Sequence, residues 1–450
     1  MFRLVSEVAH AGRLLRVAAG NNASIQRRWL SSSVSRCSAH ISHFPGAPQS
    51  PLTTGLHFTP PAALAPIPVY RVLDENGKVL DETGNGVSDI TDEEVLIWYR
   101  NMLTVNILDS IMFEAQRQGR VSFYMVSAGE EAVTVGSAAA LGPRDIICTQ
   151  YREHGVFQQR GFTLKDFMSQ LFATHNDPGK GRNMPNHYSG RTKVGVHAVA
   201  STLGTQIPHA VGAAYALKLD AQENPSDTPS LGVVYFGEGA ASEGDFHGAM
   251  NLASVKDCPV LFMCRNNGLA ISTPTNEQYR GDGIASRAIG YGMETIRVDG
   301  TDIFAVYKAT KEARRKALER NRPILLEFMS YRVSHHSTSD DSFAYRKRGD
   351  VETWKLKHNP ISRLGKWLEA KGIWDEDLDK KARSEIRREV LQELAAAEKE
   401  KKPTLKSIWT DVYAELSEEQ EEQRIELRRL MTEYPAEYDV DGHAEGINGL

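Results

Sequence analysis

The segment VVYFGEGAASEGDFHGAMNLASVKDCPVLFMCRNNG (233–268) decides the fold of this chain. Its two apolar runs, VVYF and VLFMC, have the length of buried strands, and a helical segment of small residues lies between them. The first run ends at GEG (237–239) and the second at RNN (265–267). Glycines at a strand end let the backbone approach a ligand closely, and ligands bind at the carboxyl ends of parallel strands. The segment therefore predicts a parallel α/β sheet with a ligand site at GEG and RNN.

The same alternation extends over the middle of the chain. From about 128 to 335, the apolar runs DIICTQ, METIRVDG and PILLEFMSY alternate with helical patterns such as GEEAVTVGSAAALG and TQIPHAVGAAYALKL. A long helix with a capping box at Thr91 and Glu94 precedes them. The predicted fold class is α/β, with a doubly wound parallel sheet, an extended arm before it and helices after it.

Composition divides the chain into four parts. Residues 1–43 carry six arginines and one acidic residue and are rich in serine, which is typical of a mitochondrial transit peptide. Residues 44–90 are expected to form a proline-rich arm and a small hairpin that turns at an Asn-Gly pair. Residues 91–355 are expected to form the α/β domain. Residues 356–450 are helical and highly charged, which suits a solvated tail or packing against a partner.

Charge and hydropathy exclude two classes of protein. The net charge of −5 and the pI near 6.3 argue against nucleic-acid binding, which usually requires a basic face. No apolar window is long enough to predict a transmembrane helix. The four cysteines have no CxxC spacing, so we expect buried thiols rather than a disulfide scaffold. We therefore expect neither a nucleic-acid nor a membrane partner.

The residue types at GEG and RNN indicate a magnesium and phosphate site. Glu238 and Asn267 can meet as oxygen ligands of Mg²⁺, which prefers one or two carboxylates together with substrate phosphates. Arg265 can pair with a phosphate oxygen. The turn GEGAAS is not the dinucleotide motif GxGxxG, since Ser242 stands in the place of the third glycine, and the segment contains no P-loop.

This combination resembles the diphosphate-binding motif of thiamin diphosphate enzymes. From about Ile67 onward the chain is similar to the alpha subunits of the mitochondrial branched-chain 2-oxo acid dehydrogenase complexes, in their first, decarboxylating component. The resemblance rests on AGEEAVTVGSAAAL, TQYREHGV, GKGRNMPNHY, CRNNGLAISTPTNEQYRGDGIA and HHSTSDDSFAYR. It implies a fold of the thiamin diphosphate-binding type. It also implies decarboxylation of the branched-chain 2-oxo acids from valine, leucine and isoleucine, with acyl transfer to the lipoyl group of an acyltransferase.

The resemblance implies roles for single residues. Magnesium would be bound by Glu238, Asn267 and the main-chain oxygen of Leu269. A structural potassium ion would be bound by Ser201, Thr202, Thr205 and Gln206. The cofactor would be contacted by Gln150, Tyr151, Arg152, Ser201, Leu203, Gly237, Gly239, Ala240, Arg265 and His336, with Arg152 and Arg265 on the diphosphate.

The stretch SHHSTSDDS (334–342) follows a predicted strand of the sheet and therefore leaves from the cofactor's side. The resemblance implies that His336 meets the diphosphate and takes part in acyl transfer, with His335 as an orienting neighbour. Ser337 matches the position at which a dedicated kinase inactivates the complex. A phosphate there would repel the anionic cofactor and keep the loop from ordering.

Three positions depart from the family pattern. Leu269 stands where tyrosine is usual; a carbonyl ligand survives this change, although ring contacts would be lost. The segment STL (201–203) replaces SPL, and Lys347 replaces a second phosphorylated serine. At most the switch at Ser337 carries over.

One sheet provides half of what thiamin diphosphate chemistry requires. The cofactor also needs a carboxylate that protonates its aminopyrimidine ring, and the chain offers no second half to supply one. The resemblance therefore implies an α2β2 tetramer with a beta subunit, a lipoylated acyltransferase core, a regulatory kinase and phosphatase, and a mitochondrial matrix location.

Four alternatives remain open from the residues. They are a related enzyme acting on pyruvate or 2-oxoglutarate, a nucleotide-binding enzyme, a non-catalytic structural subunit, and a zinc site at His335 and His336. Other histidines are expected to be surface or satisfied core groups; these are His154, His175, His187, His197, His209 and His247.

Overall fold

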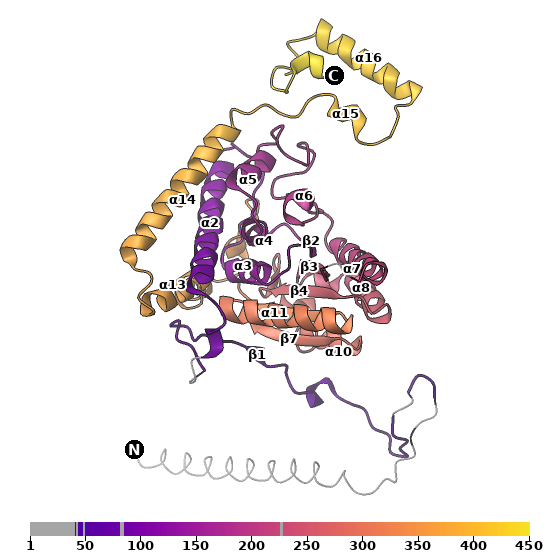
Figure 1. The fold of residues 1–450 in the computed structure, drawn as a ribbon, viewed down its shortest axis with the longest axis vertical. Coiled ribbons are helices and arrows are strands. Elements are labelled where there is room, and N and C mark those ends of the chain that lie inside the picture. The colour runs from indigo at the N-terminus through magenta and orange to yellow at the C-terminus, as the bar shows by residue number, and fades with distance from the viewer. Residues whose placement is uncertain (1–40, 42–43, 48–49, 82–84, 226–227) are drawn as a thin grey trace, which may run out of the picture. The chain divides into compact units, whose positions relative to one another are not determined.

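The structure is a computed structural model that describes residues 41, 44–47, 50–81, 85–225 and 228–450 (Figure 1). The predicted transit peptide lies outside these residues, apart from Ile41. The chain divides into two compact units, 1–65 and 66–450. In the first unit the described residues are mostly exposed, with a bridge between Ile41 and Pro51 and a 3₁₀ helix, η1 (Pro61–Ala63).

The second unit is built on a six-stranded sheet in the order β1-β7-β8-β4-β3-β2, and all of its strand pairs are parallel. The bounds are β1 (Val69–Tyr70), β2 (Ile146–Cys148), β3 (Gly232–Gly237), β4 (Val260–Asn266), β7 (Glu294–Asp299) and β8 (Ile324–Met329). A separate antiparallel hairpin consists of β5 (Leu269–Ala270) and β6 (Thr273–Pro274). This topology confirms the predicted α/β class.

Helices cover both faces of the sheet (Figure 1). The α-helices of the described residues are α2 (Asp92–Arg117), α3 (Glu131–Ala139), α4 (His154–Gln159), α5 (Leu164–Leu171), α6 (Arg191–Val194), α7 (Gln206–Glu223), α8 (Gly244–Val255), α9 (Thr275–Gln278), α10 (Ala285–Gly290), α11 (Ile303–Arg320), α12 (Arg348–Lys357), α13 (Pro360–Ala370), α14 (Glu376–Ala397), α15 (Ser407–Thr410) and α16 (Glu418–Glu433). Within the described residues, none of these helices has the length and apolar character needed to span a bilayer.

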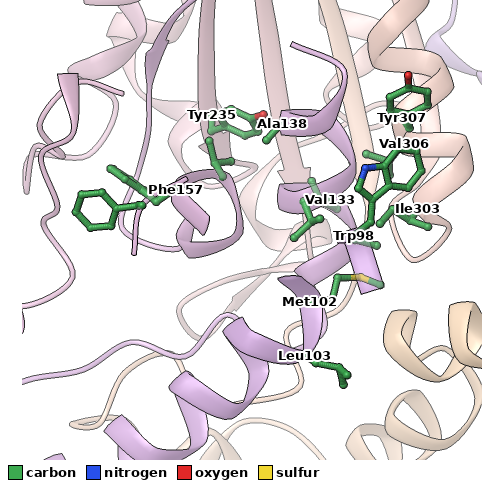
Figure 2. Close-up of a cluster of buried hydrophobic side chains, with 14 of the residues drawn as sticks. Trp98, Met102, Leu103, Val133, Ala138, Phe157, Tyr235, Ile303, Val306 and Tyr307 are labelled. Atoms are coloured by element: carbon green, nitrogen blue, oxygen red, sulfur yellow. The ribbon is translucent and has the colours of Figure 1, made fainter. Parts of the chain in front are cut away.

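Alternate residues of β2, β3, β4 and β8 enter two different cores, because side chains of a strand point to opposite faces. Val233 and Tyr235 of β3 lie in the core formed with α2, α3, α4 and α11. Val234 and Phe236 lie in the core formed with α7, α8 and α10. Figure 2 shows the first core, in which Trp98 of α2 packs near the side chains of α11. The strands are thus buried on both faces, as their continuous apolar runs predict.

The hairpin predicted in the 44–90 region forms, and the residues just before it join the parallel sheet. Its turn forms, with a bridge between Leu73 and Val79 and a hydrogen bond from Leu80 N to Val72 O of 2.9 Å. The two residues before it, Val69 and Tyr70, pair with β7 and extend the parallel sheet. The boundary between the two compact units falls at 65/66, inside the 44–90 range.

The C-terminal helices are amphipathic rather than solvated on all sides. Helix α14 packs against α2 and α5, and α13 packs against α2 and α3. The buried residues of α13 and α14 belong to the main core; they include Ile361, Leu364, Trp367, Leu368, Ile386, Val390 and Leu394. A solvated tail is therefore not what residues 360–397 form. Residues from Leu405 onward have a small cluster of their own, around Leu405, Met431 and Leu450.

Candidate functional site

A cavity of about 390 Å³ lies at the carboxyl ends of β2, β3, β4 and β8, and it gathers residues from seven separate segments of the chain. All the residues predicted to contact the cofactor or magnesium line it: Gln150, Tyr151, Arg152, Ser201, Leu203, Gly237, Glu238, Gly239, Ala240, Arg265, Asn267, Leu269 and His336. The cavity is also lined by Met125, Glu243, Ala270, Ile271, Gln278 and Arg332, which the sequence did not single out. Of the predicted potassium set, Ser201 alone lines it.

The turn GEG is held in place from neighbouring strands. Gly237 N donates to Gln150 Oε1 at 2.9 Å, and Glu238 N donates to Arg265 O at 3.1 Å. A Cβ atom on Gly239 would lie 2.8 Å from the Cβ atom of Ala270, so only glycine lets this turn approach the β5–β6 hairpin. The strand end therefore fixes the direction in which Glu238 points.

Glu238 carries a carboxylate oxygen that has no hydrogen-bond partner. Its side chain is 2% exposed; Oε2 accepts from Asn267 N at 3.3 Å, whereas the buried Oε1 accepts from no described residue. Burial raises the pKa of Glu238, and the nearby charge of Glu130 adds to this effect. A buried carboxylate oxygen without a donor is costly unless a cation or a proton occupies the space beside it.

Asn267 and Leu269 add two neutral oxygens beside Glu238. Asn267 Nδ2 donates to Glu130 Oε1 at 2.8 Å, which fixes the orientation of the amide, and Asn267 Oδ1 accepts from Leu269 N at 3.2 Å with one lone pair left for a cation. The strand partner of Leu269 is Pro274, which has no N–H to donate to the Leu269 carbonyl. A carboxylate, an amide oxygen and a carbonyl are the oxygen donors that suit Mg²⁺, so the residues present fit this ion.

Arg265 belongs to a buried ion cluster. Its Nη1 lies 2.7 Å from Glu130 Oε2, and its Nε donates to Glu153 Oε1. Burial alone would raise the pKa of Glu130, but the charges of Arg265 and Arg152 hold it below its usual value. Glu130 is a site residue that sequence reasoning missed, although the acidic pair in GEEAV, next to a strand-adjacent turn, was a signal for it. Two carboxylates already compensate the charge of Arg265.

Arg152 and Arg332 are different, because within the described residues neither forms an ion pair with a carboxylate. Both are buried, with exposed fractions of 3% and 1%. Arg152 Nη2 lies 3.0 Å from His336 Nδ1, and Arg332 Nη1 lies 3.3 Å from the same atom. Two guanidinium groups without a carboxylate in direct contact, among the described residues, lie at one end of the cavity and suit the binding of an anion.

His336 is neutral in this environment. Guanidinium groups only donate hydrogen bonds, so Nδ1 of His336 accepts and its proton lies on Nε2. Burial and the charges of Arg152 and Arg332 lower the pKa of His336 to about 3. The ring of Tyr151 meets the imidazole edge to face, at 6.1 Å between centroids. An anion bound beside both arginines would offset their charges and raise the pKa of His336 again.

The loop that carries His336 is held by a polar network. His336 N and Tyr345 Oη both donate to Asp340 Oδ2 at 2.7 Å, and Arg332 Nη2 donates to Tyr345 Oη at 2.7 Å. Ser337 is half-buried next to His336, and its Oγ accepts from Ser339 N at 3.2 Å.

His335 points away from its neighbour and bonds within the loop. Its Nδ1 accepts from Ser342 N at 2.9 Å. In the part of the chain that the structure describes, no group of three or more His, Cys, Asp and Glu side chains gathers as a metal site. The geometry gives no support to a zinc site at His335 and His336.

The predicted potassium residues lie at the start of α7. Thr205 Oγ1 donates to Thr202 O at 3.0 Å, and Gln206 Nε2 donates to Tyr235 O at 3.1 Å. Ser201 Oγ lies 2.9 Å from His187 Nε2. Among these residues the structure joins Thr205 to Thr202 by a hydrogen bond, while Gln206 bonds to β3 and Ser201 bonds to His187.

Comparison of the sequence with known proteins shows the family of this chain. Residues 99–406 match the model of the dehydrogenase E1 component. The chain belongs to this family, whose members depend on thiamin diphosphate. It is 48% identical to the mitochondrial 2-oxoisovalerate dehydrogenase subunit alpha of Mus musculus over 88% of each chain. It is 47% identical to the Homo sapiens protein of that name, over 88% of this chain and 87% of the relative. The corresponding protein of Caenorhabditis elegans is also 47% identical, over 90% and 91%.

Proposed function

We propose that this chain is the alpha subunit of a mitochondrial thiamin diphosphate-dependent dehydrogenase that decarboxylates branched-chain 2-oxo acids such as 2-oxoisovalerate. The observation that carries the proposal concerns one cavity and the described residues around it. Among these residues, Glu238 has a buried carboxylate oxygen without a hydrogen-bond partner, and the buried Arg152 and Arg332 have no carboxylate partner. These are the counterparts that a metal-bound diphosphate requires. Relatives named 2-oxoisovalerate dehydrogenase subunit alpha support the substrate class.

Each part of the cavity has a role in this proposal. Glu238, Asn267 and the Leu269 carbonyl would bind Mg²⁺, while Arg152 and Arg332 would bind diphosphate oxygens. Arg265 would contribute less, because Glu130 and Glu153 already bind it. Gln150, Gly237, Gly239 and Ala240 would shape the backbone around the cofactor, and Tyr151, Ser201 and Leu203 would line the reacting end. When bound, thiamin diphosphate would supply a nucleophilic ylid carbon and a thiazolium ring that serves as the electron sink for decarboxylation.

The histidine loop would serve the second half of the reaction. His336 would exchange a proton during transfer of the acyl group to the lipoyl group of the acyltransferase, since an imidazole beside a bound anion can titrate near neutral pH. Phosphorylation of Ser337 would add a charge of about −1.5 to −2 next to the diphosphate and displace the loop. A kinase and a phosphatase would then control activity. The structure holds Ser337 half-buried, so the loop would have to open for the kinase.

A potassium ion would bind at Ser201, Thr202, Thr205 and Gln206 and fix the loop before α7. The proposal rests on the closeness of the four residues in the sequence, on the hydrogen bond between Thr205 Oγ1 and Thr202 O, and on the oxygen-rich character of their hydroxyl, carbonyl and amide groups.

The assembly would be α2β2 in the mitochondrial matrix. The described residues provide the diphosphate end of the site, and a beta subunit would supply the carboxylate for the aminopyrimidine ring. The lipoylated acyltransferase core would dock where the histidine loop reaches the surface. Relatives that are named subunits alpha support a partner subunit.

The test is a substrate comparison on the reconstituted enzyme. The chain is co-expressed with a beta subunit, and carbon dioxide release is measured with thiamin diphosphate and Mg²⁺ on 2-oxoisovalerate, pyruvate and 2-oxoglutarate. We expect the highest kcat/KM on 2-oxoisovalerate and no turnover by the chain alone. Preference for pyruvate would instead support the pyruvate-type alternative, and activity of the isolated chain would contradict the shared site.

A further inference from the structure

Three buried polar side chains outside the cavity form a continuous hydrogen-bonded network. They are Asp109 on α2, His154 at the start of α4 and Asn186 between α5 and α6, and each is at most 1% exposed. His154 Nδ1 lies 3.0 Å from Asp109 Oδ1, and His154 Nε2 lies 3.0 Å from Asn186 Nδ2. None of the three lines the cavity, so the proposed cofactor contacts leave them without a role.

The hydrogen bonds of this network allow one arrangement of protons. Met125 N donates to Asn186 Oδ1 at 2.9 Å, which turns the amide nitrogen of Asn186 toward His154. An amide NH₂ only donates, so Nε2 of His154 accepts and its Nδ1–H donates to Asp109. Asn186 adopts the left-handed conformation with φ 69°, which asparagine tolerates better than most residues.

Asp109 holds a segment of backbone on the far side of the network. Its carboxylate accepts from Tyr124 Oη at 2.8 Å, and from both Ser127 N and Ser127 Oγ at 2.7 Å. Within the described residues Asp109 has no lysine or arginine partner, and these hydrogen bonds together with that from His154 satisfy its charge. Residues 124–127 are therefore held by hydrogen bonds to Asp109 and Asn186, and His154 bridges these two side chains.

On its other side, segment 124–128 forms hydrogen bonds with residues of the cavity and of the histidine loop. Val126 O accepts from Arg152 Nη1 at 2.5 Å. Tyr124 exchanges hydrogen bonds with Thr338, from Thr338 N to Tyr124 O at 3.1 Å and from Tyr124 N to Thr338 Oγ1 at 3.3 Å. Val333 N donates to Ala128 O at 3.2 Å. Segment 124–128 thus lies between the buried network and the loop that carries His336.

We propose that Asp109, His154 and Asn186 are positioning residues, which hold segment 124–128 as the surface on which the histidine loop and Arg152 are ordered. They touch neither cofactor nor substrate; they act through the carbonyls of Tyr124, Val126 and Ala128. The inference rests on the proposed function insofar as it takes this loop to be the catalytic one. The placement of the loop against the segment is independent of that function.

The test compares two substitutions of one residue in the assembly with the beta subunit, in the absence of cofactor. His154→Leu keeps much of the volume but removes both hydrogen bonds, whereas His154→Gln keeps one donor and one acceptor. Amide hydrogen exchange is followed in peptides that span residues 331–341. We expect exchange about tenfold faster in H154L, because losing the anchor costs about one hydrogen bond, and near wild-type exchange in H154Q.

Ser137→Ala is the matched control, since Ser137 Oγ shares a buried hydrogen bond of 2.8 Å with Tyr235 Oη that is away from the segment. We expect S137A to leave exchange in 331–341 unchanged even if it lowers the melting temperature. Unchanged exchange in H154L, or an equal increase in H154L and S137A, would overturn the inference. If H154L does not assemble, Tyr124→Phe takes its place; it removes one bond to Asp109 and should raise exchange about threefold, and no change would overturn the inference. Amide hydrogen exchange does not depend on catalytic turnover. An error in the proposed substrate would therefore leave the result unaffected.

Discussion

At the scale of single residues, Glu238 shows that the site is arranged for a ligand rather than for the stability of the free chain. Its side chain is buried, one of its oxygens has no donor among the residues that the structure describes, and burial raises its pKa. A pKa above the unfolded value means that the folded state takes up a proton more readily than the unfolded state. The folded chain is therefore stabilised at acid pH and loses that stability as pH rises.

Replacing this carboxylate by an amide should stabilise the cofactor-free protein. At pH 7.5 we expect Glu238→Gln to raise the free energy of unfolding by about 1 kcal/mol, because a buried unpaired charge is removed. Thermal melts of both proteins without Mg²⁺ and thiamin diphosphate measure this change in stability. Glu243→Gln is the control, since Glu243 lines the same cavity but is exposed. A lower melting temperature in E238Q than in wild type would contradict this view of Glu238.

His336 is expected to make the stability of the folded chain depend on pH in the opposite direction from Glu238. Burial, Arg152 and Arg332 lower its pKa to about 3, so the folded chain resists the proton that the unfolded chain takes up below about pH 6.5. Stability should therefore fall as pH decreases from 6.5 toward 3, by less than about 1.4 kcal/mol per pH unit for this partly exposed group. Melts of the cofactor-free protein at pH 7.5 and 5.5 should show a smaller drop in His336→Gln than in wild type. Equal drops would show that His336 is not held neutral.

Sequence alone predicts the residues of the cavity that carry a recognisable motif, and it misses those that are brought in by packing. Glu238 and Asn267 stand at strand ends within one segment, so their meeting follows from the fold class. Arg332 stands at no motif position, and nothing in the sequence shows that it lacks a carboxylate partner. That property depends on Glu130 and Glu153 pairing with Arg265 instead.

At the scale of elements, the loop after β8 is held by hydrogen bonds, and a negative charge on Ser337 is expected to disrupt them. Ser337 lies beside His336, whose backbone N–H bonds to Asp340. We expect Ser337→Glu to reduce acyl transfer to the lipoylated partner at least tenfold, while the Mg²⁺ affinity of the enzyme changes little, because Glu238 lies on another element. Ser339→Glu adds the same charge at an exposed position two residues on and should have a weaker effect. Equal activities of S337E and wild type would argue against the switch.

The contact between the GEG turn and the β5–β6 hairpin can be tested in the same way. Gly239→Ala would place a Cβ atom 2.8 Å from the Cβ of Ala270, so the hairpin that carries Leu269 must move. We expect about a tenfold loss of thiamin diphosphate affinity, measured by its half-saturating concentration. Gly290→Ala meets no atom within 4 Å and is the control. Unchanged affinity in G239A would mean that the hairpin does not contribute to the metal site.

Elements with a strong local pattern are predicted well from the sequence, and those formed by pairing at a distance are not. The five longer strands of the sheet coincide with the apolar runs. Strand β1 has two exposed residues and no periodicity, so its pairing with β7 depends on tertiary structure. The charge of α14 conceals its apolar stripe, which faces α2 and α5 through Ile386, Val390 and Leu394.

At the scale of the whole molecule, the chain is proposed to contribute one half of a cofactor site that it shares with a beta subunit. The second compact unit gathers the residues proposed to bind the metal and the diphosphate at one edge of its sheet, and the proposed chemistry requires a further carboxylate from a beta subunit. The sequence predicts the need for a beta subunit because we found in it no second thiamin-type half that would supply this carboxylate. It cannot predict which surface meets the partner, since that depends on side chains from several elements.

The most direct test of the account is a calorimetric titration of thiamin diphosphate into the assembly with the beta subunit. Wild type and Glu238→Ala are compared, each with Mg²⁺ and with chelator. The account predicts saturable binding by wild type that requires Mg²⁺, and at least a hundredfold weaker binding by E238A. Binding of equal affinity by both proteins, or binding by wild type that is indifferent to Mg²⁺, would contradict the assignment of this cavity as the metal and diphosphate site.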